Sequence, residues 1–173
     1  MLLDLCKNLR RVLVMQVSSQ QDLMLTITVL QQLRQLLPDA AITLMVSPSG
    51  KELGLQLPWI DDVLIYEGAD NKFRNSECEL TLIAKLRQFA FDASVIFTNP
   101  SESPYPLAYI CYLAGIPIRI GQSQEFGGSV LSHCVKPTGN EKDTGTRGHG
   151  EEFFPSAPEA PEALGASFLA PSP

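Results

Sequence analysis

The chain has 173 residues, of which 45% are hydrophobic and 18% are charged, and its formal net charge is -6. This length is sufficient for one domain with a sizeable core. Residues 138–173 hold six acidic and two basic side chains, so the preceding residues are almost neutral. They lack the basic field that nucleic-acid binding requires, and we expect no nucleic-acid partner.

The cysteines and the N-terminus indicate where the protein works. The four cysteines, Cys6, Cys78, Cys111 and Cys134, are far apart and form no CxxC pair, which argues against structural zinc and favours a reducing compartment. The start, MLLDLCKNLRR, lacks the features of a signal peptide. No segment reaches the roughly 18 apolar residues of a membrane-spanning helix. We expect a soluble, cytoplasmic protein, and peripheral contact with a membrane surface stays open.

The first part of the chain predicts a strand, a long helix and a second strand. Val12–Val17 is a valine-rich run typical of a strand that is buried on both faces. Asp22–Leu37 has helical spacing, and Pro38 ends it. The apolar face of this helix is predicted to comprise Leu25, Val29, Leu30, Leu33, Leu36 and Leu37. Ala41–Val46 is the second predicted strand.

The alternation of strands and helices continues to about residue 120. The predicted elements are a short helix over 51–56, strands over 63–66, 93–97 and 116–120, and helices over 77–89 and 104–114. Gly115 is predicted to end the last helix. Alternating strands and helices indicate an α/β, Rossmann-like fold with a mainly parallel sheet and helices on both faces. Residues 1–137 are predicted to form this domain.

Residues 138–173 have a different character. They contain five prolines, five glycines and few apolar residues, which show no periodicity. We therefore predict a disordered Pro/Gly-rich acidic tail, because such a segment buries too little apolar surface to offset its ordering entropy. The abrupt change in composition suggests a non-native reading frame or a truncation.

Four segments, in order, resemble a known family. They are VSSQQDLMLTITVL after the first strand, LPWIDDV at 57–63, FDASVI at 91–96 and AGIPIRIG at 114–121. Together they resemble the N-terminal signature of glycosyltransferase family 9, which includes the heptosyltransferases of lipopolysaccharide synthesis. Two positions differ from the family pattern: Gln21 stands where the family has glycine, and Thr28 where it has proline.

The resemblance implies a fold and a function. Family members have the two-domain GT-B fold, in which the N-terminal domain binds the acceptor and the C-terminal domain binds a nucleotide-sugar. This chain would supply the acceptor-binding half. The implied reaction is inverting transfer of a sugar from a donor such as ADP-heptose to a lipopolysaccharide-type glycolipid acceptor, without metal or cofactor. The implied partners are therefore the nucleotide-sugar and the glycolipid. A non-catalytic remnant or binding module is the alternative function.

The residues that carry this chemistry are predicted to follow the strands. Asp22 stands where the family has its catalytic aspartate, and a carboxylate there is suited to take a proton from the acceptor hydroxyl. The same residue is also suited to cap the helix, which would lower its pKa and weaken it as a base. Ser18 and Ser19 offer donors to an anionic group at the helix N-terminus, or form an ordinary polar turn.

Two further candidates lie later in the chain. Asn99 follows the fourth strand and is suited to bind acceptor hydroxyls, although capping of its loop is favoured. Arg119, predicted at the end of the fifth strand, is suited to pair with an acceptor phosphate or carboxylate, or to form a structural salt bridge. Neither a G-x-G-x-x-G nor a G-x-x-x-x-G-K-[ST] motif is present, which argues against a dinucleotide or P-loop enzyme.

Overall fold

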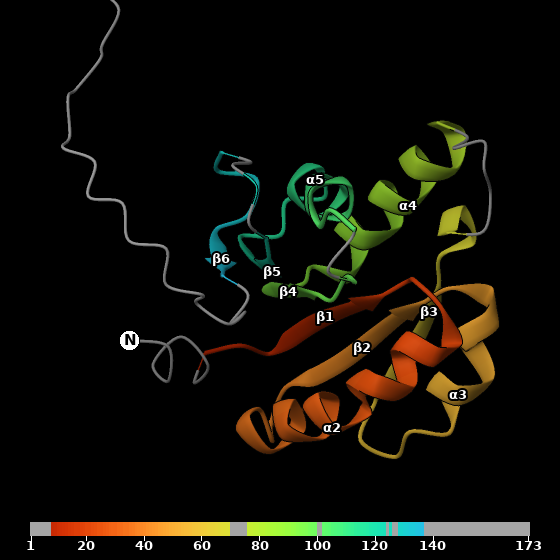
Figure 1. Cartoon of the computed structure of the whole chain (residues 1–173). Helices are drawn as coiled ribbons and strands as arrows, with labels where there is room; N and C mark the ends of the chain where they lie inside the picture. Colours follow the sequence, from red (N-terminus) through yellow and green to blue (C-terminus); the bar gives the residue numbers. More distant parts are fainter. Residues whose placement is uncertain (1–7, 70–75, 100–101, 124, 126–127, 137–173) are drawn as a thin grey trace, which may run out of the picture. The chain divides into compact units, whose positions relative to one another are not determined.

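The computed structural model describes residues 8–69, 76–99, 102–123, 125 and 128–136. The predicted tail over 138–173 lies outside the described residues, so its disorder and the domain boundary near 137 stay predictions. The described residues form one Rossmann-like α/β domain, as the sequence predicts (Figure 1).

The domain is built on a six-stranded sheet in which each adjacent pair of strands is parallel. The strands lie in the order β3-β2-β1-β4-β5-β6. Their bounds are β1 Arg11–Gln16, β2 Ala41–Val46, β3 Asp62–Ile65, β4 Ala93–Ile96, β5 Ile118–Gln122 and β6 His133–Val135. Because β1 pairs with both β2 and β4, the first strand lies inside the sheet rather than at its edge.

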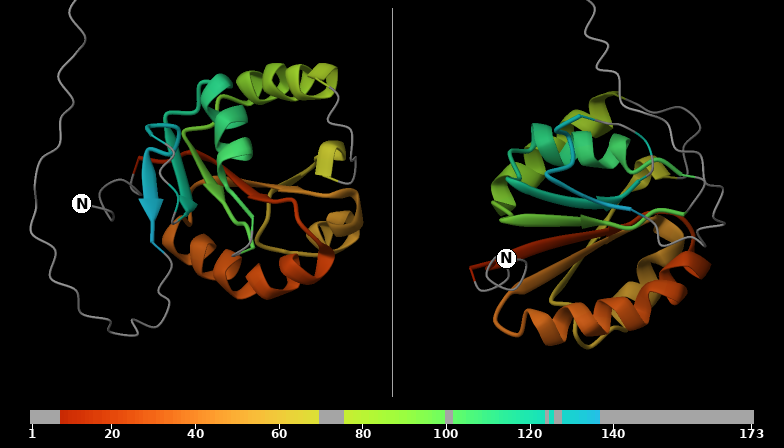
Figure 2. Two further views of the ribbon diagram at one scale, coloured as in Figure 1. Left: turned by 45° about the horizontal axis from the view of Figure 1, so that its top comes forward. Right: turned by 60° about the vertical axis from the view of Figure 1, so that its left-hand side comes forward.

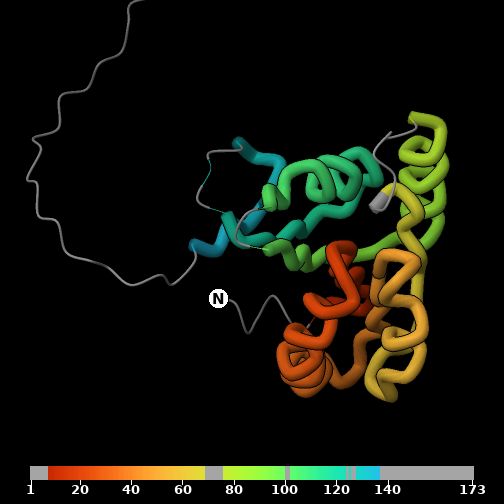
Figure 3. The backbone as a smooth tube through the Cα atoms, turned by 45° about the vertical axis from the view of Figure 1, so that its right-hand side comes forward, coloured from red at the N-terminus to blue at the C-terminus, as the bar shows by residue number. Residues whose placement is uncertain are grey.

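Helices cover both faces of this sheet. They are α2 Gln20–Leu36, α3 Lys51–Leu55, α4 Ser76–Phe89 and α5 Tyr105–Leu113, with single 3₁₀ turns at Pro48–Gly50 and Glu67–Ala69. Helices α2 and α3 lie on one face, and α4 and α5 on the other (Figures 2 and 3). Leu13 and Met15 of β1 belong to the core under α4 and α5, whereas Val12 and Val14 pack under α2. This double burial explains the unbroken apolar run of β1.

The structure differs from the prediction at the fifth and sixth strands for clear reasons. Strand β5 spans Ile118–Gln122 instead of 116–120, since Pro117 lacks the N–H that a ladder needs. Strand β6 was not predicted, because its three residues are all exposed and give no apolar pattern. Gly115 does end α5, with φ of 82°, a conformation that suits glycine.

Cys111 is a buried core residue. Its Sγ lies 3.4 Å from Sδ of Met15 in the core between α5 and the sheet. Burial raises the pKa of the Cys111 thiol to about 11. The thiol is therefore protonated at neutral pH and unsuited to act as a nucleophile.

The prediction for the buried face of α2 was partly wrong. Leu30 and Leu37 are buried, but Leu25, Val29 and Leu36 are 81%, 43% and 58% exposed. At about 100° per residue these three lie opposite Leu23, which packs into the core. The helix therefore has two apolar faces, which the sequence prediction merged into one. Its ten exposed residues include no charge: Gln20, Gln21, Met24, Leu25, Thr28, Val29, Gln31, Gln32, Gln35 and Leu36.

We expect Leu25→Gln to leave the free energy of unfolding unchanged within about 0.5 kcal/mol, because an exposed side chain loses little contact area. Urea denaturation monitored by circular dichroism measures this. The same change at Leu55, which is 63% exposed on α3, serves as the control. A loss above about 2 kcal/mol at Leu25 alone would mean that this face of α2 is packed against something.

Candidate functional site

The sheet order creates one place where ligands are expected to bind. The chain leaves β1 towards β2 and leaves β4 towards β5, so the connections diverge between β1 and β4. In open α/β sheets, a crevice forms at this switch point beyond the carboxyl ends of the strands. The segment 18–22 follows β1, and the segment 98–102 follows β4. Both segments therefore start at the edge where a site is expected.

Asp22 and Ser19 hold each other at the start of α2. Ser19 is the N-cap residue, and its Oγ accepts a hydrogen bond from the backbone N–H of Asp22 at 3.2 Å. In return, the Asp22 carboxylate accepts hydrogen bonds from Ser19, at 3.1 Å from its backbone nitrogen and 2.5 Å from its hydroxyl oxygen. This reciprocal arrangement is a capping box. Asp22 therefore helps to cap α2, which is one of the two roles predicted for it.

Asn99 connects this helix start to the end of β4. Its side-chain nitrogen Nδ2 donates to Oδ2 of Asp22 at 3.2 Å. All three side-chain and backbone donors to Asp22 therefore reach Oδ2. Within the described ranges, no hydrogen bond to Oδ1 is present. The carboxylate is therefore fixed through Oδ2, and Oδ1 has no hydrogen-bond partner among the described residues.

A second carboxylate lies beside this group. Ser18 donates its hydroxyl to Glu102 at 2.7 Å, and the backbone N–H of Glu102 donates to the carbonyl of Asn99 at 2.9 Å. Glu102 was not predicted as a site residue. Its position three residues after Asn99, in the same loop beyond a parallel strand, was the signal that could have identified it.

The electrostatics of the site are set by hydrogen bonds. Those from the Ser19 side chain, the Asn99 side chain and the Ser19 backbone lower the pKa of Asp22 below its ordinary value of 3.8. Asp22 is therefore ionised at neutral pH. Because Ser18 and Ser19 already donate to Glu102 and Asp22, their hydroxyls are engaged by carboxylates of the chain itself. This arrangement favours ligands that donate hydrogen bonds over anionic ligands.

Arg119 is not brought to this site. Its partner in the β4–β5 register is Ser94, near the amino end of β4. The side chain is 8% exposed, and it donates to backbone carbonyls of Ile116, Pro117, Ser129 and Val130. It also lies over the Tyr112 ring, with 5.2 Å from Cζ to the ring centroid. The guanidinium thus joins the start of β5 to the segment before β6.

The structure also shows where other residues of the sequence motifs lie. Gln21, at the position of the family's glycine, is exposed in the first turn of α2. Asp61, in the second motif, forms an ion pair with Arg34 and accepts from the backbone N–H of Ile42 at 2.7 Å. Asp92, in the third motif, accepts from the backbone N–H groups of Arg10 and Arg11. These two aspartates therefore anchor strand ends rather than line the crevice.

No group of His, Cys, Asp or Glu in the described part of the chain could hold a metal ion. The absence of a metal from the reaction stays a prediction. Among the helices that the structure describes, none has the length and apolar character needed to cross a bilayer.

We expect Ser19→Ala to lower the free energy of unfolding by about 0.5–2 kcal/mol, the usual effect of losing an N-cap side chain. Equilibrium urea unfolding measures this change. Ser18→Ala is the matched control, since Ser18 donates to Glu102 and does not cap the helix. Equal losses in the two variants would contradict the assignment of Ser19 as the cap.

The lowered pKa of Asp22 predicts a dependence of stability on pH. A carboxylate whose folded-state pKa lies below its unfolded value stabilises the fold above the unfolded pKa. This contribution is lost as the pH falls through the folded-state pKa. We therefore expect the stability difference between the wild-type chain and Asp22→Asn to be full at pH 7, to start to fall near pH 3.8 and to vanish only below the lowered folded-state pKa of Asp22. Thermal denaturation of both proteins across this range tests it; a constant difference would contradict it.

Comparison with known proteins agrees with the fold. No protein-family model matches the sequence, and no curated protein matches it. Among solved structures, the chain is similar to the glycosyl transferase family 9 protein from Veillonella parvula DSM 2008, with a TM-score of 0.51 and 21% sequence identity. The similarity covers 65% of this chain and 31% of the other. The two proteins therefore share a fold over about a third of the length of the Veillonella protein.

Proposed function

We propose that the described domain is the acceptor-binding part of a glycosyltransferase and that Asp22 is its general base. The observation that supports this most directly is the placement of the Asp22 carboxylate at the switch point. Ser19 and Asn99 hold Oδ2 from the ends of two neighbouring strands, and Oδ1 accepts no hydrogen bond from the described residues. The shared fold with a family 9 glycosyltransferase supports the same proposal.

The proposed reaction is an inverting displacement. The acceptor hydroxyl oxygen attacks the anomeric carbon of a nucleotide-sugar while Oδ1 of Asp22 takes the hydroxyl proton. A new C–O bond forms on one face of the sugar, and the bond to the nucleoside diphosphate breaks on the other. The diphosphate leaves with the bonding electron pair. Asn99 and Ser19 keep the carboxylate oriented during this step.

The lowered pKa of Asp22 affects how well it serves as a base. General-base catalysis is most effective when the pKa of the base is near the working pH. Asp22 is ionised, and so ready to accept a proton, but its low pKa makes it a weak base. The proposed catalysis therefore depends on orientation of the acceptor as much as on proton transfer.

The finer details of the reaction also belong to this proposal. The resemblance in sequence favours a heptose or related sugar as the transferred group, ADP-heptose or a similar nucleotide-sugar as the donor, and a glycolipid of the lipopolysaccharide type as the acceptor. Such a reaction would take place in the cytoplasm, at or near the membrane surface that carries the glycolipid. No metal or cofactor takes part in the proposed step.

A non-catalytic sugar-binding module is the second candidate. Two observations favour it: the low pKa of Asp22, and the exposed Gln21 side chain in the first turn of α2. In this case the same polar groups would hold sugar hydroxyls without taking a proton. The two candidates share a binding site and differ in the effect of Asp22→Asn on turnover.

Nuclear magnetic resonance titration tests whether the site binds sugars. The isotope-labelled chain is titrated with methyl α-D-mannopyranoside and with ADP. We expect the mannoside to shift the backbone amide signals of Ser18, Ser19, Asp22 and Asn99, and Asp22→Ala to weaken the response. Asp39→Ala, in the turn after α2, is the control. Shifts caused by ADP but not by the sugar would overturn the assignment of an acceptor site.

A further inference from the structure

The face of the sheet that carries α2 and α3 is covered unevenly. The side chains of β1 and β2 on this face, such as Val12, Val14 and Leu44, are fully buried. Four apolar side chains of β4 and β5 on the same face are only half-buried: Val95, Phe97, Ile118 and Ile120. Parallel sheets are normally buried on both faces. The helices that the structure describes therefore leave an apolar part of this sheet half exposed.

Helix α2 turns an apolar side towards this open part of the sheet. Its exposed apolar residues at three, seven and fourteen positions after Asp22 lie within about 60° of Asp22 around the helix axis: Leu25, Val29 and Leu36. This side faces β4, because Asp22 accepts a hydrogen bond from Asn99. The other side of α2 faces β3, since Arg34 forms an ion pair with Asp61.

Together these residues form a step in which α2 is the wall and the sheet is the floor. We call it the α2–β5 step, and it comprises Leu25, Val29 and Leu36 of the wall and Val95, Phe97, Ile118 and Ile120 of the floor. The wall extends over fifteen residues of α2, which is about 22 Å. Two strands span about 10 Å, close to the diameter of a helix with its side chains. The step therefore has room for one further helix beside α2.

The charges around the step indicate how such a helix would lie. The ten exposed residues of α2 carry no charge, and the floor is apolar. Carboxylates lie at one end, where Asp22 follows β1 and Glu102 follows β4. Within the described ranges, neither carboxylate forms an ion pair with a basic side chain. A helix with its N-terminus at this end would place the positive end of its dipole beside both of them.

We propose that the α2–β5 step docks an amphipathic α-helix of a partner protein, which runs in the same direction as α2. The contact face of this helix is apolar and uncharged, with apolar residues at a spacing of three and four, as in other helix-in-groove complexes. Its N-terminus lies towards Asp22 and Glu102. The inference goes beyond the proposed function and does not depend on whether Asp22 takes a proton.

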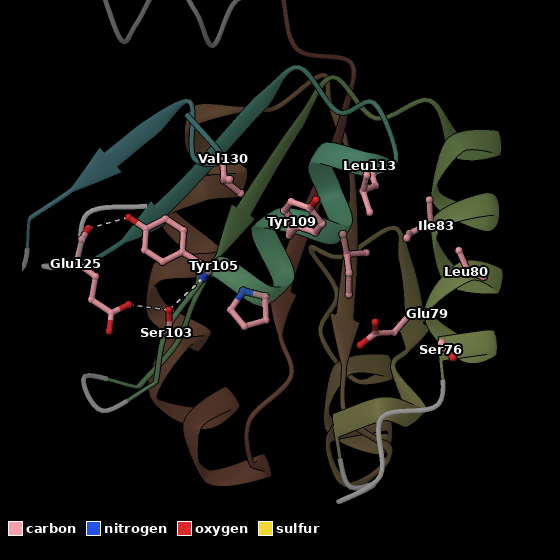
Figure 4. A pocket seen from close by; sticks show the side chains of 12 residues that line it. Ser76, Glu79, Leu80, Ile83, Ser103, Tyr105, Tyr109, Leu113, Glu125 and Val130 are labelled. Carbon is pink, nitrogen blue, oxygen red and sulfur yellow. Dashed lines mark hydrogen bonds between the residues drawn. The ribbon is translucent and has the colours of Figure 1, made fainter. Parts of the chain in front are cut away.

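A second exposed apolar surface provides a control for unspecific binding. It is a groove on α4 and α5, and Tyr109, which is 53% exposed, is one of its lining residues (Figure 4). Helices α4 and α5 lie on the opposite face of the sheet from α2. A peptide that binds to any apolar surface would bind this groove as well as the step.

The test uses two synthetic peptides and the full chain. Each peptide has about 18 residues of leucine, alanine, glutamine and lysine with blocked ends, and would span about 27 Å as a helix. One has its leucines on a single helix face, and the other has the same residues in scrambled order. The step variants are Leu25→Gln and Leu36→Gln, and the controls are Leu55→Gln on α3 and Tyr109→Gln on α5. All four side chains are mostly exposed, so the variants are expected to fold.

We expect each step variant to bind the amphipathic peptide about tenfold more weakly than the wild-type chain, because the peptide no longer covers a leucine. The control variants should stay within about twofold of the wild-type affinity. The direction of the helix is read from a nitroxide attached to either end of the peptide. The N-terminal label should broaden the amide signals of Ser19 and Asn99, and the C-terminal label those near Leu36.

Four results would overturn the proposal. The scrambled peptide binding as tightly as the amphipathic one would show that binding does not need a helix, and an equal loss in Tyr109→Gln would show that it is unspecific. Dimerisation of the chain that Leu25→Gln abolishes, seen by sedimentation velocity, would make a second copy the occupant. Binding to phosphatidylcholine vesicles that Leu25→Gln abolishes would assign the step to a bilayer. A reversed pattern of broadening would contradict the direction of the helix.

Discussion

Asp22→Ala is expected to lower kcat by about 10²–10⁴-fold in an active two-domain enzyme that contains this domain, the usual contribution of a positioned general base. The substitution removes the oxygen that would take the acceptor proton. It also removes the group that Ser19 and Asn99 hold. Initial rates at saturating acceptor and donor measure the effect, so that weaker binding does not obscure a loss in kcat.

Two further variants separate catalysis from support of the helix. Asp22→Asn keeps the shape of the side chain and an oxygen acceptor but cannot take the proton, so kcat should fall as with alanine. Gln21→Gly should preserve or raise kcat if the exposed glutamine obstructs the site. An Asp22→Ala enzyme with wild-type kcat would leave Asp22 only its role in the capping box and would favour the non-catalytic module.

Arg119→Met is expected to destabilise the domain by about 2–4 kcal/mol while leaving sugar binding unchanged. The Arg119 side chain donates to the carbonyl of Ile116, before β5, and to those of Ser129 and Val130, in the β5–β6 connection, and it is largely buried. Methionine fills part of the volume but leaves these carbonyls without their donors. The free energy of unfolding from urea denaturation and the mannoside titration together test this prediction.

Arg87→Met is the matched control for Arg119. Arg87 also donates from its guanidinium to the backbone, but it reaches a single carbonyl, that of Leu113, in an exposed place. We expect a loss of no more than about 1 kcal/mol there. Unchanged stability together with lost sugar binding in Arg119→Met would instead assign Arg119 to the acceptor, which was one of the two roles expected from the sequence.

Local sequence patterns were sufficient to predict the class of the fold. Apolar runs such as that of β1 and helical spacing such as that of α2 reflect burial directly, and their alternation implies a parallel sheet. The order of the strands was not predictable in this way, since it depends on which apolar surfaces meet. For the same reason, the two apolar faces of α2 were not distinguished, because periodicity alone does not say which face meets the sheet.

The sequence was sufficient to predict the site residues that directly follow a strand. It was not sufficient for residues whose place depends on contacts between distant parts of the chain. Ser18, Ser19, Asp22 and Asn99 come together because they follow neighbouring parallel strands. Glu102 was missed because its link to Ser18 joins residues 84 positions apart. Arg119 was misplaced because the strand begins after Pro117, which puts the arginine near its start.

The central position of β1 has a consequence for biosynthesis. β1 is made first, but its partner β4 follows about eighty residues later, and Asn99 cannot reach Asp22 until that strand has left the ribosome. During this interval one edge of β1 has no partner, and such apolar edges favour aggregation. The contact between Asn99 and Asp22 therefore forms only after β4 has been made, so the site is completed late in synthesis.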